Sequence, residues 1–162
     1  MGRAGFESYY SVLYGERWPK LKEALSGDVR YAAWNAGGKE PYFLDAASVL
    51  AAFSLPLSGA HTVLDLCAAP GGKSLAAADL MRGEGRVISA DLSPQKVERI
   101  AENVARTGFA ACVTPEQSDA AVFRKDWETA FDLVIADLPC SGLGVLGRKP
   151  DIKLRLKEAD IA

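Results

Sequence analysis

The sequence predicts an α/β fold built on a mostly parallel sheet, and three observations support this. From Thr62 onward the chain alternates strand, turn and helix, which is typical of βαβ units. A glycine-rich turn, residues 68–72, follows the first of these strands. Residues 131–138 are almost continuously apolar, as expected for a parallel strand buried on both faces. The content of 49% hydrophobic and 25% charged residues excludes a disordered or fibrous chain.

Residues 1–60 predict a small N-terminal helical segment. Apolar side chains recur at helical spacing from Phe6, a second helix is expected from Trp18, and a third from Ala46. Asp45 precedes the third helix and is a suitable N-cap. Between the second and third helices, Tyr31–Gly38 is expected to form a loop or an edge strand.

Residues 61–162 predict a second domain with four strands. Ser93 is expected to cap the second helix of this domain, and Gly108 to end it. The expected strands are Thr62–Cys67, Arg86–Asp91, Ala111–Thr114 and Phe131–Leu138, and the expected helices are Lys73–Met81 and Pro94–Thr107. The usual strand order 3-2-1-4 leaves the fourth strand at an open edge, where residues 131–138 could pair with another chain. Such a sheet normally continues, so we expect this chain to be the front part of a larger protein.

Composition excludes several function classes. With 19 basic and 21 acidic residues the net charge is −2, which argues against binding nucleic acid by bulk charge alone. Three cysteines (Cys67, Cys112, Cys140) and His61 provide neither a disulfide framework nor a zinc site, so we expect no metal. We expect no signal peptide, because Met1 is followed by a mixed, charged segment, and the longest apolar stretch, residues 46–57, is too short to span a bilayer. A cytoplasmic protein is therefore expected.

The glycine-rich turn admits three interpretations. A phosphate-binding P-loop needs a glycine at position 67, where this chain has Cys67, although Gly72-Lys73-Ser74 fits the end of the motif. The dinucleotide pattern G-x-G-x-x-G is absent. The third interpretation is S-adenosylmethionine, because Asp91 ends the second strand 20 residues after Gly71, where a carboxylate can accept hydrogen bonds from both ribose hydroxyls.

A second acidic residue could complete such a cofactor site. Asp119 lies in the loop after the third strand, from which a side chain can reach the edge of an adenine ring. Ser118-Asp119 equally fits a helix N-cap, so both interpretations of Asp119 stay open.

The fourth strand ends in Asp137-Leu-Pro-Cys140, which suggests chemistry on a pyrimidine. A thiolate that adds to carbon 6 of cytosine makes carbon 5 nucleophilic enough to accept a methyl group. A carboxylate such as Asp137 can hydrogen-bond the ring nitrogen and amino group and favour that addition. Judged from these residues alone, Cys140 is the candidate nucleophile, and a buried inert cysteine is the alternative.

Several motifs together resemble the RNA cytosine-5 methyltransferases of the Sun (RsmB/RsmF) family. The motifs are residues 42–48 (YFLDAAS), 65–74 (DLCAAPGGKS), 91–93 (DLS), 119–120 (DA) and 137–153 (DLPCSGLGVLGRKPDIK). The resemblance implies a Rossmann-like class I methyltransferase sheet with an incomplete C-terminal half. It also implies an S-adenosylmethionine site lined by Cys67, Ala68, Ala69, Pro70, Gly71, Gly72, Lys73, Asp91, Asp119 and Asp137. The implied catalytic residues are Cys140, Asp137 and Lys73.

The resemblance also assigns the cysteine roles differently. In this family the attacking cysteine usually lies in a later Thr-Cys motif, and the cysteine that matches Cys140 assists release of the methylated RNA. No Thr-Cys occurs in these 162 residues. We therefore expect either the cofactor-binding front of a methyltransferase or a catalytically incomplete module that binds S-adenosylmethionine or RNA.

The resemblance indicates an RNA partner. Residues 6–19 are similar to the subgroup of mitochondrial ribosomal RNA enzymes, which favours ribosomal RNA over transfer RNA. Residues 147–158 carry five cationic side chains against two carboxylates, a net charge of +3. That segment could follow a phosphate backbone or form a solvated amphipathic helix, and its spacing favours the solvated helix.

Overall fold

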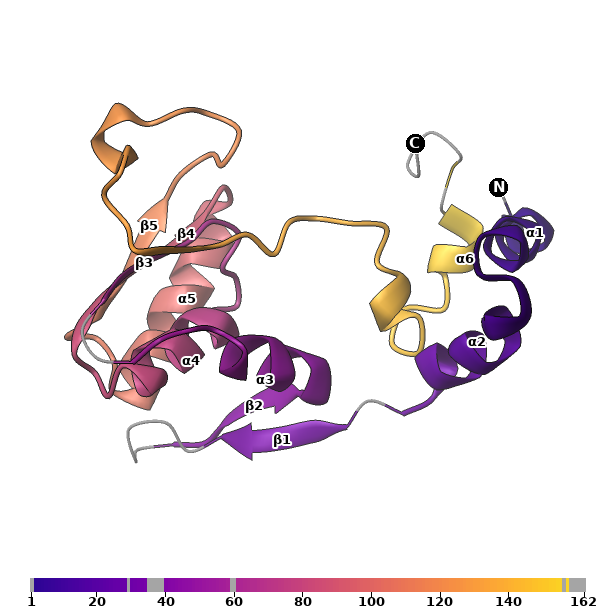
Figure 1. Ribbon diagram of the computed structural model, residues 1–162, viewed down its shortest axis with the longest axis horizontal. Helices are drawn as coiled ribbons and strands as arrows, with labels where there is room; N and C mark the ends of the chain where they lie inside the picture. The colour runs from indigo at the N-terminus through magenta and orange to yellow at the C-terminus, as the bar shows by residue number, and fades with distance from the viewer. Residues whose placement is uncertain (1, 29, 35–39, 59–60, 156, 158–162) are drawn as a thin grey trace. The chain divides into compact units, whose positions relative to one another are not determined.

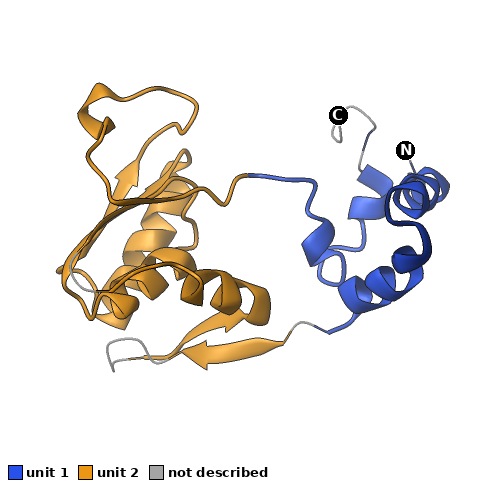
Figure 2. Ribbon diagram, viewed as in Figure 1, with its two compact units in different colours: residues 1–29, 139–162 blue, residues 30–138 orange. Residues whose placement is uncertain are grey.

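The computed structural model describes residues 2–28, 30–34, 40–58, 61–155 and 157. Contacts divide the chain into two compact units, which are described separately here (Figure 2). The smaller unit joins Met1–Val29 to Pro139–Ala162, and the larger unit is Arg30–Leu138. The units are groupings by contact, so the domain division predicted at residue 60 stays a prediction.

The larger unit is built on a four-stranded parallel sheet. Its strands are β3 (His61–Asp65), β4 (Gly85–Asp91), β5 (Val113–Gln117) and β6 (Leu133–Ile135). They lie in the order β5-β4-β3-β6, with every neighbouring pair parallel. If these four strands are numbered 1 to 4 in chain order, their order in the sheet is 3-2-1-4, as the sequence predicts. Because all pairs are parallel, the carboxyl ends of the four strands lie at one edge.

Helices α4 (Gly72–Leu80) and α5 (Pro94–Thr107) follow β3 and β4 and cover one face of the sheet (Figure 1). Leu75 of α4 and Ile100 of α5 are fully buried in the same apolar cluster as Val63 and Val87 of the strands. On the opposite face the partly buried side chains that contact the sheet are Leu66, Trp127 and Phe131. In the described part of the larger unit, then, no helix of the doubly wound kind covers that second face.

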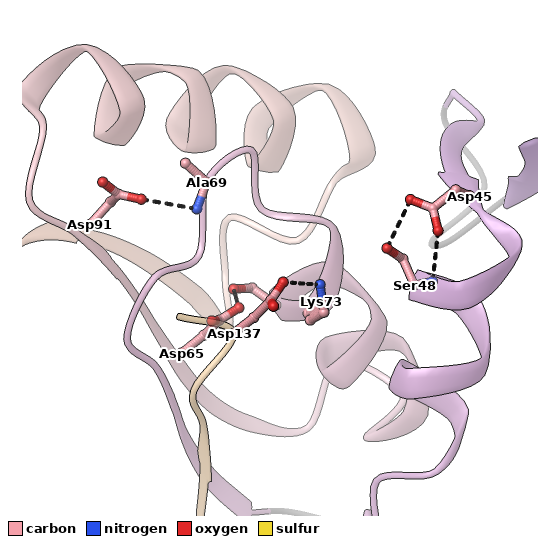
Figure 3. Close-up of polar contacts among 8 residues, drawn as sticks. Asp45, Ser48, Asp65, Ala69, Lys73, Asp91 and Asp137 are labelled. Carbon is pink, nitrogen blue, oxygen red and sulfur yellow. Dashed lines mark hydrogen bonds and ion pairs between the residues drawn. The ribbon is translucent and has the colours of Figure 1, made fainter. Parts of the chain in front are cut away.

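A hairpin and a helix precede the sheet. Strands β1 (Tyr31–Trp34) and β2 (Tyr42–Asp45) pair antiparallel, so the first half of the predicted loop or edge strand is a strand. Residues 35–39 lie outside the described residues. Helix α3 (Ala46–Phe53) begins as predicted, with the Asp45 carboxylate accepting hydrogen bonds from the Ser48 N–H at 2.9 Å and the Ser48 hydroxyl at 3.0 Å (Figure 3).

Two local predictions in this unit are wrong. Strand β6 includes only three residues of the predicted 131–138, because Phe131 packs with Trp127 instead of pairing with β3. Ser93 occupies the N-cap position of α5, but its hydroxyl bonds to the Gln95 side chain and caps no backbone N–H. Gly108 ends α5 in the left-handed conformation, as predicted. Pairing of the 131–138 edge with another chain stays a prediction.

The smaller unit brings together the two ends of the sequence. It contains α1 (Gly2–Tyr14), a 3₁₀ turn η1 (Gly15–Arg17), α2 (Trp18–Ser26), η4 (Leu143–Val145) and α6 (Ile152–Arg155). The buried side chains of its core come from both ends: Phe6, Tyr10, Trp18, Leu146 and Ile152. The N-terminal helices therefore hold the segment that follows the Asp-Leu-Pro-Cys motif. The sequence also predicts the opening of a further helix over Lys153–Ala162, and within that range residues 156 and 158–162 lie outside the described residues.

None of the helices within the described ranges combines the length and apolarity needed to cross a bilayer.

Candidate functional site

The glycine-rich turn lies at the carboxyl edge of the sheet and is tied to its surroundings by hydrogen bonds. The Ala68 N–H donates to the carbonyl of Ala90 at 2.9 Å, at the end of β4. The Asn103 side chain, on α5, donates to the carbonyl of Pro70 at 2.8 Å. These bonds fix a turn whose own side chains are small, and within it Pro70 is exposed and Ala69 is partly exposed.

Two glycines of the turn have separate structural requirements. Gly71, directly before α4, has φ +105°, a left-handed conformation that L-residues rarely adopt. A Cβ on Gly72 would lie 2.4 Å from Leu44 Cδ2 and 3.2 Å from Tyr42 Cε1. Gly72 therefore lets the β2 strand pack closely against the start of α4.

Asp91, at the carboxyl end of β4, is 4% exposed and points toward the turn (Figure 3). Its Oδ2 accepts a hydrogen bond from the Ala69 N–H at 3.4 Å, and its Oδ1 accepts one from the Ser93 N–H at 3.3 Å. Lys96 Nζ lies 3.4 Å from the same Oδ1. A carboxylate has about four acceptor positions, so long bonds of this kind leave Asp91 able to accept further hydrogen bonds from a ligand.

Asp65 is a buried acid that the predicted site residues do not include. It ends β3, is 1% exposed, and its Oδ2 accepts a hydrogen bond from the Ser74 hydroxyl at 2.7 Å. The Ser74 hydroxyl is also 2.7 Å from that of Ser89 on β4. Oδ1 of Asp65 is buried without a hydrogen-bond partner among the described residues. Burial raises the pKa of Asp65 to about 6, and the Ser74 hydrogen bond opposes this. A carboxylate that ends an apolar strand is the sequence signal that points to Asp65.

Lys73 joins the cofactor turn to the tip of the fourth strand. Its ammonium lies 2.6 Å from Oδ2 of Asp137, and both residues belong to the larger unit (Figure 3). The Lys73 side chain is 24% exposed and that of Asp137 is 60% exposed. The pair therefore fixes one oxygen of the Asp137 carboxylate beside the turn and leaves the group accessible.

The remaining predicted residues lie in different surroundings. The exposed Asp119 accepts a hydrogen bond from the Ala121 N–H at 2.9 Å, and the residues directly after it form a turn and not a helix. Cys67 is half-buried in the turn, and burial, together with the charges of Asp91 and Asp65, raises the pKa of its thiol. Cys140 is an exposed free thiol in the smaller unit.

Because Asp65 titrates inside the fold, we expect it to make stability depend on pH. Between the ordinary pKa of 3.8 and the folded pKa of about 6, the folded chain holds a proton that the unfolded chain has released. Raising the pH through this window should therefore destabilise the ligand-free fold, by about 2 to 3 kcal/mol. Urea unfolding from acid to neutral pH measures this, with Asp65→Asn as the reference that does not titrate. Parallel pH profiles for the two proteins would contradict the assignment.

Comparison with known proteins places this site in a family. The family described as "16S rRNA methyltransferase RsmB/F" matches residues 52–162. The chain is 44% identical over 119 residues to a probable ribosomal RNA small subunit methyltransferase B of Bacillus subtilis, covering 73% of this chain and 26% of that protein. It is 40% identical over 114 residues to ribosomal RNA small subunit methyltransferase B of Salmonella paratyphi B, covering 69% of this chain and 25% of that protein. The chain thus spans about a quarter of the length of these relatives.

Solved structures give the same fold. NSun6 from Pyrococcus horikoshii, crystallised with SFG, superposes with a TM-score of 0.62 at 28% identity, over 78% of this chain and 31% of that one. A methyltransferase homologue from the same organism gives a TM-score of 0.70 at 19% identity, over 96% of this chain and 63% of that one. The predicted class I methyltransferase fold is confirmed, and S-adenosylmethionine is the cofactor of the family. The family match and the sequence identities agree with the motifs at 65–74 and 137–153: the chain belongs to the 16S rRNA methyltransferase RsmB/F family.

Proposed function

We propose that this chain is the cofactor-binding part of an enzyme that methylates carbon 5 of cytosine in RNA through a covalent cysteine adduct. The RNA that we propose as its substrate is ribosomal RNA. The observation that carries the proposal is the ion pair of Lys73 and Asp137, with 2.6 Å between Nζ and Oδ2. It holds a carboxylate suited to a cytosine ring beside the turn that follows β3. The relatives named for ribosomal RNA methylation support the choice of substrate.

The residues around the turn fit S-adenosylmethionine. Asp91 has acceptor capacity for two ribose hydroxyls, and the turn offers backbone without bulky side chains. The buried Oδ1 of Asp65 is an unpaired acceptor at the same strand edge. When bound, S-adenosylmethionine supplies a methyl group activated by a positively charged sulfur. We propose residues 67–73, Asp91, Asp119 and Asp137 as its binding site.

The protein residues then divide the remaining tasks. Asp137, oriented by Lys73, accepts a hydrogen bond from the exocyclic amino group of cytosine and so holds the ring in place for addition of a thiolate to carbon 6. Addition of sulfur makes carbon 5 nucleophilic, and loss of the carbon-5 proton to a base lets the thiol leave after methylation. We assign Cys140 to release of the methylated RNA. Its thiol is exposed and lies three residues after Asp137, and the family resemblance gives this cysteine that role.

The test is methyl transfer with identification of the product. We expect little or no transfer to 16S rRNA by the 162-residue chain alone. A fusion to the part of the Bacillus subtilis relative that follows its matched region should transfer tritium from methyl-labelled S-adenosylmethionine. Mass spectrometry of the digested RNA should then find 5-methylcytidine, and Asp137→Asn should abolish it even at S-adenosylmethionine concentrations that saturate the variant.

Other outcomes contradict specific parts of the proposal. A different methylated nucleoside would refute the carbon-5 chemistry. Robust turnover by the chain alone that Cys140→Ser abolishes and Cys67→Ser spares would make Cys140 the nucleophile. Calorimetry without heat of S-adenosylmethionine binding, with a folded chain, would refute the cofactor site.

A further inference from the structure

The acidic total charge of the chain conceals an uneven distribution between its units. The described residues of the larger unit carry fourteen carboxylates and nine Lys or Arg side chains. Those of the smaller unit carry five carboxylates and nine Lys or Arg side chains. The unit that holds the proposed cofactor site therefore repels a polyanion, whereas the unit that holds Cys140 attracts one.

Helices from both ends of the sequence meet at Glu7 of the smaller unit. Lys22 Nζ on α2 lies 2.7 Å from Glu7 Oε1, and the Trp18 ring N–H donates to Glu7 Oε2 at 3.1 Å. The hydrogen bond from Lys22 lowers the pKa of Glu7, with a smaller contribution from the charge of Lys153 on α6. Lys22 thus contacts Glu7 directly, the charge of Lys153 also acts on this carboxylate, and the two positive charges exceed its single negative charge.

The segment that carries Lys153 is held rigidly enough to extend this surface. Leu146 and Ile152 are buried in the aromatic core, and the exposed Lys149 lies between them. A Cβ on Gly147 would lie 2.7 Å from the carbonyl oxygen of Gly27, so this segment packs directly against the end of α2. The Ile152 N–H bonds to the carbonyl of Lys149 at 3.1 Å, which places Lys149 one turn before Lys153. The backbone that carries these lysines is anchored, so binding does not have to order it.

We propose that Lys22, Lys149 and Lys153 form a surface that binds the phosphate backbone of the RNA substrate. This inference rests on the proposed function and adds the place where the RNA is held. Lysine ammonium groups contact phosphates as point charges without reading the bases, which suits a surface that positions RNA for chemistry directed by other residues. The charges of Lys22 and Lys153 exceed that of the single Glu7 carboxylate, and the exposed Lys149 adds a third positive charge, which favours a polyanion.

Salt-dependent RNA binding tests the surface. Fluorescence anisotropy of a short fluorescein-labelled single-stranded RNA, titrated with the chain across a salt series, gives the slope of log affinity against log salt concentration. Each phosphate contact on single-stranded RNA contributes about 0.7 to that slope, so replacing all three lysines by glutamine should reduce it by about 2. Lys20→Gln is the matched control, since Lys20 lies two residues from Lys22, about 200° around α2. It should leave the slope unchanged.

A second variant and a second ligand keep the outcomes distinct. Lys149→Gln leaves the Glu7 contacts in place and should reduce the slope by about 0.7. Calorimetry with S-adenosylmethionine should give the same affinity for all variants. If the triple lysine variant kept the salt slope of RNA binding and still bound the cofactor, the surface would be refuted and the proposed function would stand. If the unmodified chain did not bind the cofactor, the proposed function would be refuted. If the lysine substitutions weakened binding of polyglutamate and left RNA binding unchanged, the surface would be assigned to an acidic protein and the inference would be overturned.

Discussion

Replacing Phe6 by alanine should lower the free energy of unfolding of the smaller unit by about 3 to 5 kcal/mol. Phe6 is 0% exposed, and its ring centroid lies 4.7 Å from that of Tyr10 and 5.9 Å from that of Trp18. Removing the ring leaves a cavity between the N-terminal helices and the segment that contains Leu146. Urea unfolding followed by the fluorescence of Trp18, with Trp34 and Trp127 replaced by phenylalanine in both proteins, measures the loss.

Val12→Ala on the same helix is the matched control for that experiment. Val12 is 84% exposed, so its truncation should change the free energy of unfolding by no more than about 0.5 kcal/mol. Because Phe6 packs with Leu146 and Ile152, its loss should also make the backbone between them more sensitive to limited proteolysis. Equal destabilisation by the two substitutions would show that the aromatic cluster does not hold this segment.

Local signals account for most of what the sequence predicts correctly. Asp45 and Gly108 act at helix ends through contacts within a few residues, so their roles can be read from neighbouring sequence. The strand order follows from alternation of strands and helices together with the handedness of their connections. Asp91 is identifiable because it combines a strand end with a fixed distance from the glycine-rich turn.

The features that the sequence does not reveal depend on distant partners. Nothing near Leu146 indicates that it packs against Phe6, some 140 residues earlier, because its short segment has too few apolar positions to define a periodicity. The contact between Ser74 and Ser89 joins a helix to a neighbouring strand and leaves no local pattern. Ser93 fails as a side-chain cap because Gln95 provides a competing acceptor for its hydroxyl.

Replacing Asp91 by alanine should weaken S-adenosylmethionine binding at least about 100-fold. Each hydrogen bond to a charged group contributes about 1.5 to 3 kcal/mol, and the proposed site uses two from the ribose to this carboxylate. The substitution also removes the acceptor for the backbone N–H groups of Ala69 and Ser93, so the turn loses part of its support. Isothermal titration calorimetry of the folded chain measures the affinity directly.

Two further substitutions separate the roles of charge and position at Asp91. Asp91→Asn keeps the size of the side chain but turns an N–H₂ group toward one of the two N–H donors, Ala69 or Ser93, so we expect it to bind the cofactor almost as poorly as the alanine variant. Glu98→Gln removes an exposed carboxylate from α5, the helix that follows β4, and should leave the affinity unchanged. If Asp91→Asn bound S-adenosylmethionine as tightly as the unmodified chain, the charge of Asp91 would not be what recognises the ribose. Asp91→Asn keeps one acceptor oxygen, so the assignment of the β4 tip as the ribose site would fail only if Asp91→Ala also bound S-adenosylmethionine as tightly as the unmodified chain.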